Sequence, residues 1–154
     1  MRSTLVLRDT VAVMADLERF VQAQDQGGTY DRALAELRAG RKTSHWMWFV
    51  FPQIAGLGRS PTAQRYAIES LEEARAYLDH PVLGRRLVEC AQAVLSHPDR
   101  TARQIMGTPD DAKLRSSMTL FALAAVDSVP VFQEVLDTFF AGQRDPRTVH
   151  LVGA

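Results

Sequence analysis

Two segments of the sequence place polar side chains beside large aromatic rings. The first segment, residues 40–53 (GRKTSHWMWFVFPQ), sets Lys42, His45 and Gln53 around Trp48. A flat aromatic wall with a few polar groups at its rim suits a planar or sugar-like ligand. His45 is the candidate general acid or base, because imidazole titrates near neutral pH. The competing interpretation is that both tryptophans bury apolar area in the core and that His45 only hydrogen-bonds a carbonyl.

The second segment covers residues 107–121 (GTPDDAKLRSSMTLF). Asp110, Lys113 and Ser117 recur at helical spacing, so they share one helix face. Asp110 is the second candidate acid or base, and Lys113 and Ser117 are candidate ligand-binding residues. The competing interpretation is that the acidic residues only favour the helix N-terminus. In that reading, Ser116, Ser117 and Thr119 hydrogen-bond back to the carbonyl four residues earlier.

We expect the two segments to meet in one polar cleft that binds a small molecule, such as a nucleotide- or ADP-ribose-like compound. In this hypothesis Lys42, Trp48, Gln53, Lys113 and Ser117 bind the ligand. If the protein is an enzyme, the expected reaction is hydrolysis or group transfer. Two non-catalytic alternatives stay open: a regulatory module that uses the same cleft, and a protein-interaction module that uses exposed aromatic side chains as a hot spot.

Helical patterns run through almost the whole chain, and strand-like alternation is nearly absent. Ser44 is expected to cap a short aromatic helix that ends at Pro52. Thr108 is expected to cap a helix with Pro109 at its first position, as Ser60 does with Pro61. The prediction is an all-α, irregular multi-helix globule of about seven or eight helices. Residues 1–15 form a poorly defined N-terminal segment, and residues 16–154 form a single domain.

Composition narrows the classes of function. The chain of 154 residues has 18 basic and 18 acidic residues, and this zero net charge argues against a nucleic-acid partner. Its single cysteine, Cys90, allows no internal disulfide, and the four histidines lack the spacing of a zinc site. No metal and no cofactor are expected. The apolar runs are too short to span a membrane, which indicates a cytoplasmic protein without a membrane partner. The oligomeric state stays open.

The motif HWMWFVFPQ at residues 45–53, followed by GLGRS at 56–60 and YAI at 66–68, resembles the signature of a bacterial family called domain of unknown function 1810. Supporting positions lie in residues 107–121 and at Asp145 and Thr148, and the resemblance extends from about Leu17 to Leu151. It implies a mainly helical fold of its own small superfamily and no established activity. Members have sometimes carried the label calpastatin, which does not suit this chain because calpain inhibitors of that kind are disordered repeats.

Overall fold

The computed structural model describes residues 16–126 and 128–153, and the N-terminal segment expected at residues 1–15 lies outside this range. A helix covers residues 16–25, and a short 3-10 turn, η1 (Gln26–Gly28), follows it. The remaining described helices are α2 (Thr29–Arg38), α3 (Met47–Val50), α4 (Pro61–Arg65), α5 (Leu71–Asp79), α6 (Leu83–Leu95), α7 (Ala102–Met106), α8 (Asp110–Ala125), α9 (Val131–Phe139) and α10 (Pro146–Val152). Within the described ranges there is no strand, only an isolated bridge between Ile54 and Ile68. The all-α prediction is therefore confirmed, with somewhat more helices than expected.

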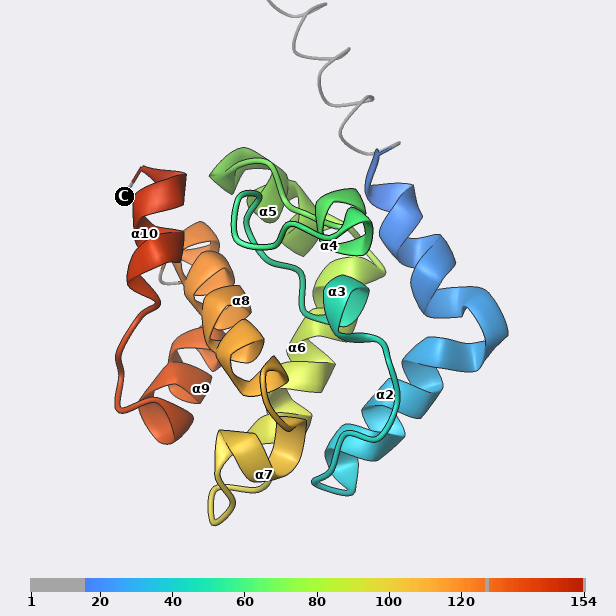
Figure 1. Ribbon diagram of the computed structural model, residues 1–154, viewed down its shortest axis with the longest axis vertical. Coiled ribbons are helices and arrows are strands. Elements are labelled where there is room, and N and C mark those ends of the chain that lie inside the picture. Colours follow the sequence, from blue (N-terminus) through green and yellow to red (C-terminus); the bar gives the residue numbers. More distant parts are fainter. Residues whose placement is uncertain (1–15, 127, 154) are drawn as a thin grey trace, which may run out of the picture.

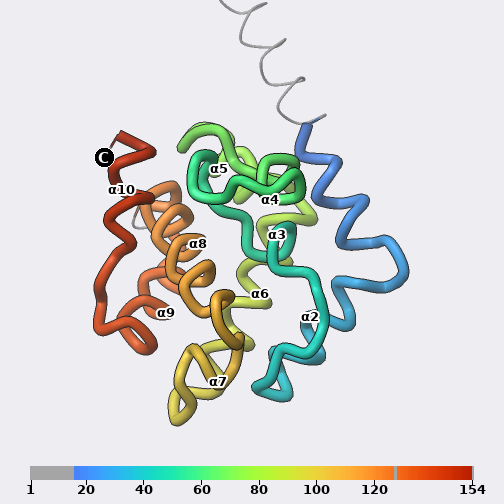
Figure 2. Tube along the Cα trace, viewed as in Figure 1, coloured from blue at the N-terminus to red at the C-terminus, as the bar shows by residue number. Residues whose placement is uncertain are grey.

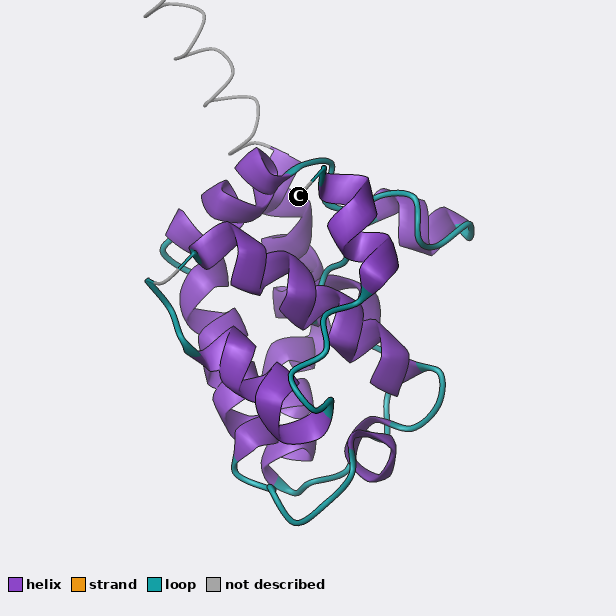
Figure 3. Cartoon of the chain, turned by 90° about the vertical axis from the view of Figure 1, so that its left-hand side faces the viewer, coloured by secondary structure: helices purple, strands orange, loops and turns teal. Residues whose placement is uncertain are grey.

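Helix α8 is the central element of the globule. It packs against α5, α7, α9 and α10, while α6 packs against α2, α5 and α9. Figure 1 shows α9 and α10 on one side of α8, with α2 at the opposite edge of the molecule. From Leu114 onward most side chains of α8 are buried, as expected for a helix enclosed on several sides. Figure 3 shows the described chain as helices joined by loops, without a strand.

A row of contacting aromatic rings links helices from both halves of the sequence. Phe20 of the first helix meets Tyr77 of α5 with ring centroids 5.3 Å apart, and Tyr77 meets Phe121 of α8 at 5.2 Å. Phe121 in turn lies 5.8 Å from Phe132 of α9. Such pairs add directional contacts to the area that they bury. The described residues therefore form one continuous core, which is the expected property of a single domain.

The turn between α5 and α6 depends on a close backbone approach. A Cβ atom added to Gly84 would lie 2.0 Å from the carbonyl oxygen of Leu78, so no other residue fits without moving one helix. His80 closes the same turn, because its Nδ1 accepts hydrogen bonds from the backbone amides of Val82 (3.1 Å) and Leu83 (3.3 Å). These amides begin α6, which would otherwise have unpaired donors at its N-terminus.

Among the helix caps expected from the sequence, those at Ser44 and Thr108 are wrong. The aromatic helix α3 begins only at Met47, and the Ser44 hydroxyl donates to the Glu36 carboxylate instead of accepting from the helix. Helix α8 begins at Asp110 directly after Pro109, and the Thr108 side chain does not cap it. The Ser60 cap is confirmed, because its hydroxyl accepts from the Ala63 amide at 3.1 Å.

The segment between α2 and α5 crosses the front of the molecule and carries both α3 and α4 (Figure 2). It brings the first chemically interesting segment of the sequence against the start of α8. Among the described residues, no helix combines the length and the apolar character that a membrane crossing requires.

Candidate functional site

The two segments singled out in the sequence meet through Asp110. Its Oδ2 lies 2.9 Å from Nζ of Lys42, and its Oδ1 lies 3.3 Å from Nζ of Lys113. One carboxylate therefore holds two ammonium groups, and the cluster keeps a net positive charge. Lys42 comes from the loop after α2, whereas Asp110 and Lys113 share the first turn of α8. The structure thus joins three of the seven candidate residues through ion pairs.

Each of these lysines also lies over a tryptophan ring. Nζ of Lys42 is 4.8 Å from the centroid of Trp46, and Nζ of Lys113 is 4.1 Å from the centroid of Trp48, which is cation–π geometry. The chain contains 18 Lys and Arg residues, yet these two are its only lysines, and the two rings are its only tryptophans. The confinement of lysine and tryptophan to the two candidate segments could have been noticed from the composition of the chain, although the spacing of motifs does not reveal it.

A cleft of about 320 Å³ opens beside the cluster. Its walls, here called the lysine cleft, are formed by Lys42, His45, Trp46, Met47, Trp48, Phe49, Thr62, Asp110 and Lys113. Trp46 is only 1% exposed, whereas Trp48 is half-buried and His45 is exposed. Trp48 is therefore the tryptophan that can offer its ring to a ligand.

The two lysines differ in how firmly they are held. The Lys42 side chain is 7% exposed and also donates a 2.6 Å hydrogen bond to the Ser44 carbonyl. The Lys113 side chain is 24% exposed and is bound only to Asp110 and the face of Trp48 within the described residues. Lys42 therefore ties the loop to α8, and Lys113 is the ammonium group better placed to reach a ligand.

Glu36 of α2 organises the loop that carries Lys42, a role that sequence reasoning missed. Its Oε1 accepts hydrogen bonds from the amides of Thr43 (2.7 Å) and Ser44 (3.0 Å) and from the Trp46 indole (2.9 Å). Burial raises the pKa of the Glu36 carboxyl, but the hydrogen bonds from Ser44, Thr43 and Trp46 outweigh burial and lower this pKa to about 2. Nothing in the local sequence marks Glu36, because it looks like any acidic residue on a helix surface.

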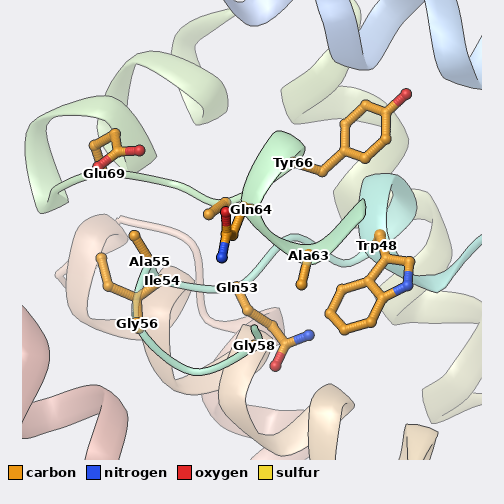
Figure 4. Close-up of a pocket in the computed structure, with 11 residues that line it drawn as sticks. Trp48, Gln53, Ile54, Ala55, Gly56, Gly58, Ala63, Gln64, Tyr66 and Glu69 are labelled. Carbon is orange, nitrogen blue, oxygen red and sulfur yellow. The ribbon is translucent and has the colours of Figure 1, made fainter. Parts of the chain in front are cut away.

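The absence of a side chain at Gly58 leaves room for the Trp48 ring and for Ala63. A Cβ atom added to Gly58 would lie 2.5 Å from the Ala63 Cβ and 3.5 Å from the Trp48 ring. Figure 4 shows Trp48, Ala63, Gly58 and Gln53 around a pocket of about 260 Å³. The ring therefore has a defined position between α3, α4 and the loop that joins them.

Gln53 does not line the lysine cleft. It lies in a neighbouring hollow of about 280 Å³, here called the glutamine hollow. Its walls are Trp48, Gln53, Leu57, Gly58, Pro109, Ala112, Lys113, Arg115, Ser116, Asp145 and Arg147. The two cavities share Trp48 and Lys113. Ser117 lines neither of them: it is fully buried, and its hydroxyl has no hydrogen-bond partner within the described residues.

The other hydroxyls of α8 anchor the C-terminal helix. The single hydroxyl hydrogen of Ser116 is shared between the Ala112 carbonyl (3.2 Å) and Oδ2 of Asp145 (2.9 Å). Thr119 donates to the Arg115 carbonyl (2.8 Å) and accepts from the Asp145 amide (2.9 Å). The expected bonds back to the preceding turn are therefore present at Ser116 and Thr119, but the expectation is wrong for Ser117, whose hydroxyl has no partner within the described residues. The hydroxyls of Ser116 and Thr119 also position Asp145 at the start of α10.

The fold and site define a small all-α protein in which two lysines, one aspartate and two tryptophans converge beside an open cleft. The sequence matches the family described as "Protein of unknown function (DUF1810)" over residues 14–152, and the chain belongs to this family. It is similar to the crystal structure of the conserved hypothetical protein Rv1873 from Mycobacterium tuberculosis, with 53% sequence identity and a TM-score of 0.86. This similarity covers 90% of this chain and 97% of that chain. Comparison with curated proteins gave no match.

Proposed function

We propose that the protein binds a small anionic molecule with a planar ring, such as a nucleotide- or ADP-ribose-like compound, in the lysine cleft. The observation that carries this proposal is the Lys42–Asp110–Lys113 cluster beside the half-buried ring of Trp48. Two ammonium groups against one carboxylate favour an anion. The aromatic face offers a stacking surface, and a cavity of this size falls near the lower end of small-molecule sites.

The solvent exposure of each side chain in the cleft suggests which part of the ligand it would contact. Lys113 is the contact for a phosphate or carboxylate group, and Trp48 is the contact for the ring. Asp110 has each oxygen engaged by an ammonium group, so it positions the lysines and leaves proton transfer to His45 at the exposed rim. In the catalytic form of the proposal, His45 acts as general acid or base in hydrolysis or group transfer.

The protein-interaction alternative has less support in the geometry. Trp46 is buried and donates its indole hydrogen to Glu36, so it cannot form a surface hot spot. Trp48 borders concave cavities, whereas a hot spot for a protein partner is expected on a convex face. A small-molecule cleft therefore accounts better for the placement of both rings.

Fluorescence titration tests the proposal. Nucleoside mono- and diphosphates, ADP-ribose and sugar phosphates are added to the wild type and to Trp48→Phe, which keeps only the buried Trp46 as a tryptophan fluorophore. We expect saturable quenching in the wild type and none in Trp48→Phe, with binding weakened by about tenfold or more in Lys113→Gln. The absence of any response in fluorescence and in melting temperature across the panel would contradict the proposal.

Product analysis then separates the two forms of the proposal. A bound compound recovered unchanged after long incubation assigns the protein to binding or regulation. Conversion that disappears in His45→Ala, while binding persists, assigns it to catalysis.

A further inference from the structure

We propose that the glutamine hollow is a second subsite, which binds an oxyanion: a phosphate or carboxylate group of a small molecule. Its walls adjoin the lysine cleft at Trp48 and Lys113. Three observations support this assignment: the charge of the lining, the state of the two arginines in it, and a buried amide without a partner.

The lining carries more positive than negative charge. Lys113, Arg115 and Arg147 face a single carboxylate, that of Asp145. Oδ2 of Asp145 already accepts from the hydroxyls of Ser116 (2.9 Å) and Thr148 (2.6 Å). Hydroxyls, and not cations, bind this oxygen. Within the described residues, Asp145 forms no ion pair with Lys113, Arg115 or Arg147. Lys113 is already paired with Asp110 at 3.3 Å, so the positive charge that remains available to an anion comes from Arg115 and Arg147.

The two arginines differ in a way that suits anion binding. Nε of Arg115 donates to the Gln143 carbonyl (2.9 Å), and its Nη2 donates to the Arg144 carbonyl (2.8 Å). These bonds fix the guanidinium group while its charge stays intact. Arg147 is exposed and forms no ion pair in the described part of the chain. The hollow therefore combines a fixed positive charge with a free guanidinium group, which can bind an oxyanion through two parallel hydrogen bonds.

Gln53 supplies the third observation. The residue is only 9% exposed, and its Nε2 has no hydrogen-bond partner within the described residues. Its backbone is held in place, since its carbonyl accepts from the Ile68 amide at 2.8 Å. Figure 4 shows the amide directed toward Gly58 and the Trp48 ring. A buried donor without a partner is unfavourable. Because Gln53 lines the hollow, a ligand oxygen bound there would be the acceptor that this donor lacks.

The subsite extends the proposed function without depending on it. If a ring lies against Trp48 in the lysine cleft, the glutamine hollow is where the anionic end of the same molecule would bind. In that form the inference rests on the proposed function. Binding of an oxyanion alone rests only on the residues of the hollow.

NMR titration tests the subsite directly. ¹⁵N-labelled protein is titrated with inorganic pyrophosphate, and separately with succinate, at constant ionic strength. We expect the side-chain NH₂ signals of Gln53 to shift in a saturable manner. Arg147→Glu should weaken this binding by about tenfold or more. Arg75→Glu is the matched control, because it alters the net charge equally at an exposed position outside both cavities, and it should change the affinity by less than about twofold.

Saturable shifts at Gln53 with either anion support the subsite, and the tighter anion identifies the chemical group. Non-saturable shifts, unmoved Gln53 signals, or equal losses in Arg147→Glu and Arg75→Glu would overturn it. The two proposals can fail separately. Nucleotides that quench Trp48 while pyrophosphate leaves Gln53 unmoved would refute only the subsite. Pyrophosphate binding without any response to ring compounds would refute only the proposed function.

Discussion

Replacing Glu36 by alanine should loosen the loop that carries Lys42 and Trp46. The substitution removes the acceptor for the Trp46 indole and for the amides of Thr43 and Ser44. Trp46 is almost fully buried, so its indole hydrogen cannot turn to water, and this unpaired donor costs about 1–3 kcal/mol. The two loop amides can be hydrated and lose about 0.5–1 kcal/mol each.

The free energy of unfolding of Glu36→Ala should therefore fall by roughly 2–5 kcal/mol. For a chain of this size, that loss corresponds to a Tm lower by about 6–15 °C. Glu36→Gln is the matched control, because its amide oxygen can still accept from the indole and the loop amides. The Ser44 hydroxyl can then accept from the new NH₂ group. Glu36→Gln keeps these hydrogen bonds but loses the extra strength that the negative charge gives them. Because Glu36 is partly exposed to water, this loss should lower the free energy of unfolding by about 1–2 kcal/mol.

The difference in unfolding free energy between the wild type and Glu36→Gln should depend on pH. The pKa of Glu36 is lowered from 4.5 to about 2 in the folded protein, so its ionised form stabilises the fold fully above pH 4.5. This contribution is lost as the pH falls from 4.5 toward 2. Glutamine does not titrate, and the gap in unfolding free energy between wild type and Glu36→Gln should therefore shrink over that window.

Urea denaturation followed by circular dichroism at pH 7 and at pH 3 measures both effects. A Glu36→Ala protein within about 0.5 kcal/mol of the wild type would refute the role of Glu36 as the organiser of the loop. A gap between wild type and Glu36→Gln that is the same at both pH values would refute the electrostatic part of the reasoning.

Three further predictions concern other parts of the fold. Gly84→Ala should destabilise the protein by about 2 kcal/mol or more in urea denaturation, because its Cβ would clash with the Leu78 carbonyl; wild-type stability would contradict this packing. Asp110→Asn should lower stability by about 1–3 kcal/mol yet tighten the binding of pyrophosphate, since two ammonium groups lose their carboxylate; weaker anion binding in titrations would contradict this. Burial raises the pKa of the Cys90 thiol to about 12, so its reaction with a disulfide reagent at pH 8 should follow unfolding; rapid labelling of the native protein would contradict its burial.

Much of the helical fold can be predicted from the sequence, because the residues that begin and end a helix interact with groups only a few positions away. Ser60 and Ala63 are three positions apart, so the cap is visible in the sequence, and the structure confirms it. The prediction for Ser44 is wrong because a carboxylate eight positions earlier, on the preceding helix, competes for its hydroxyl. Such a competitor is found only when α2 and the following loop have been placed in space.

The candidate site is only partly predictable, for a related reason. Helical spacing correctly places Asp110, Lys113 and Ser117 on one face, but α8 passes from the surface into the core along that face. Ser117 is therefore buried, although it lies one turn beyond Lys113. Gln53 follows the proline that ends α3, so its side chain enters a different cavity from that of His45. The contact of Lys42 with Asp110 joins residues far apart in the sequence, and local spacing holds no information about it.

The restriction of lysine to two positions has a practical consequence. Reagents that modify primary amines can react in this chain only with Lys42, Lys113 and the α-amino group. Reductive methylation with ¹³C-formaldehyde would therefore give a spectrum in which every lysine signal comes from the candidate site. The more exposed Lys113 should be methylated faster than Lys42. A molecule bound in the lysine cleft would protect Lys113 from the reagent. A slower methylation of Lys113 would therefore report binding without any further label.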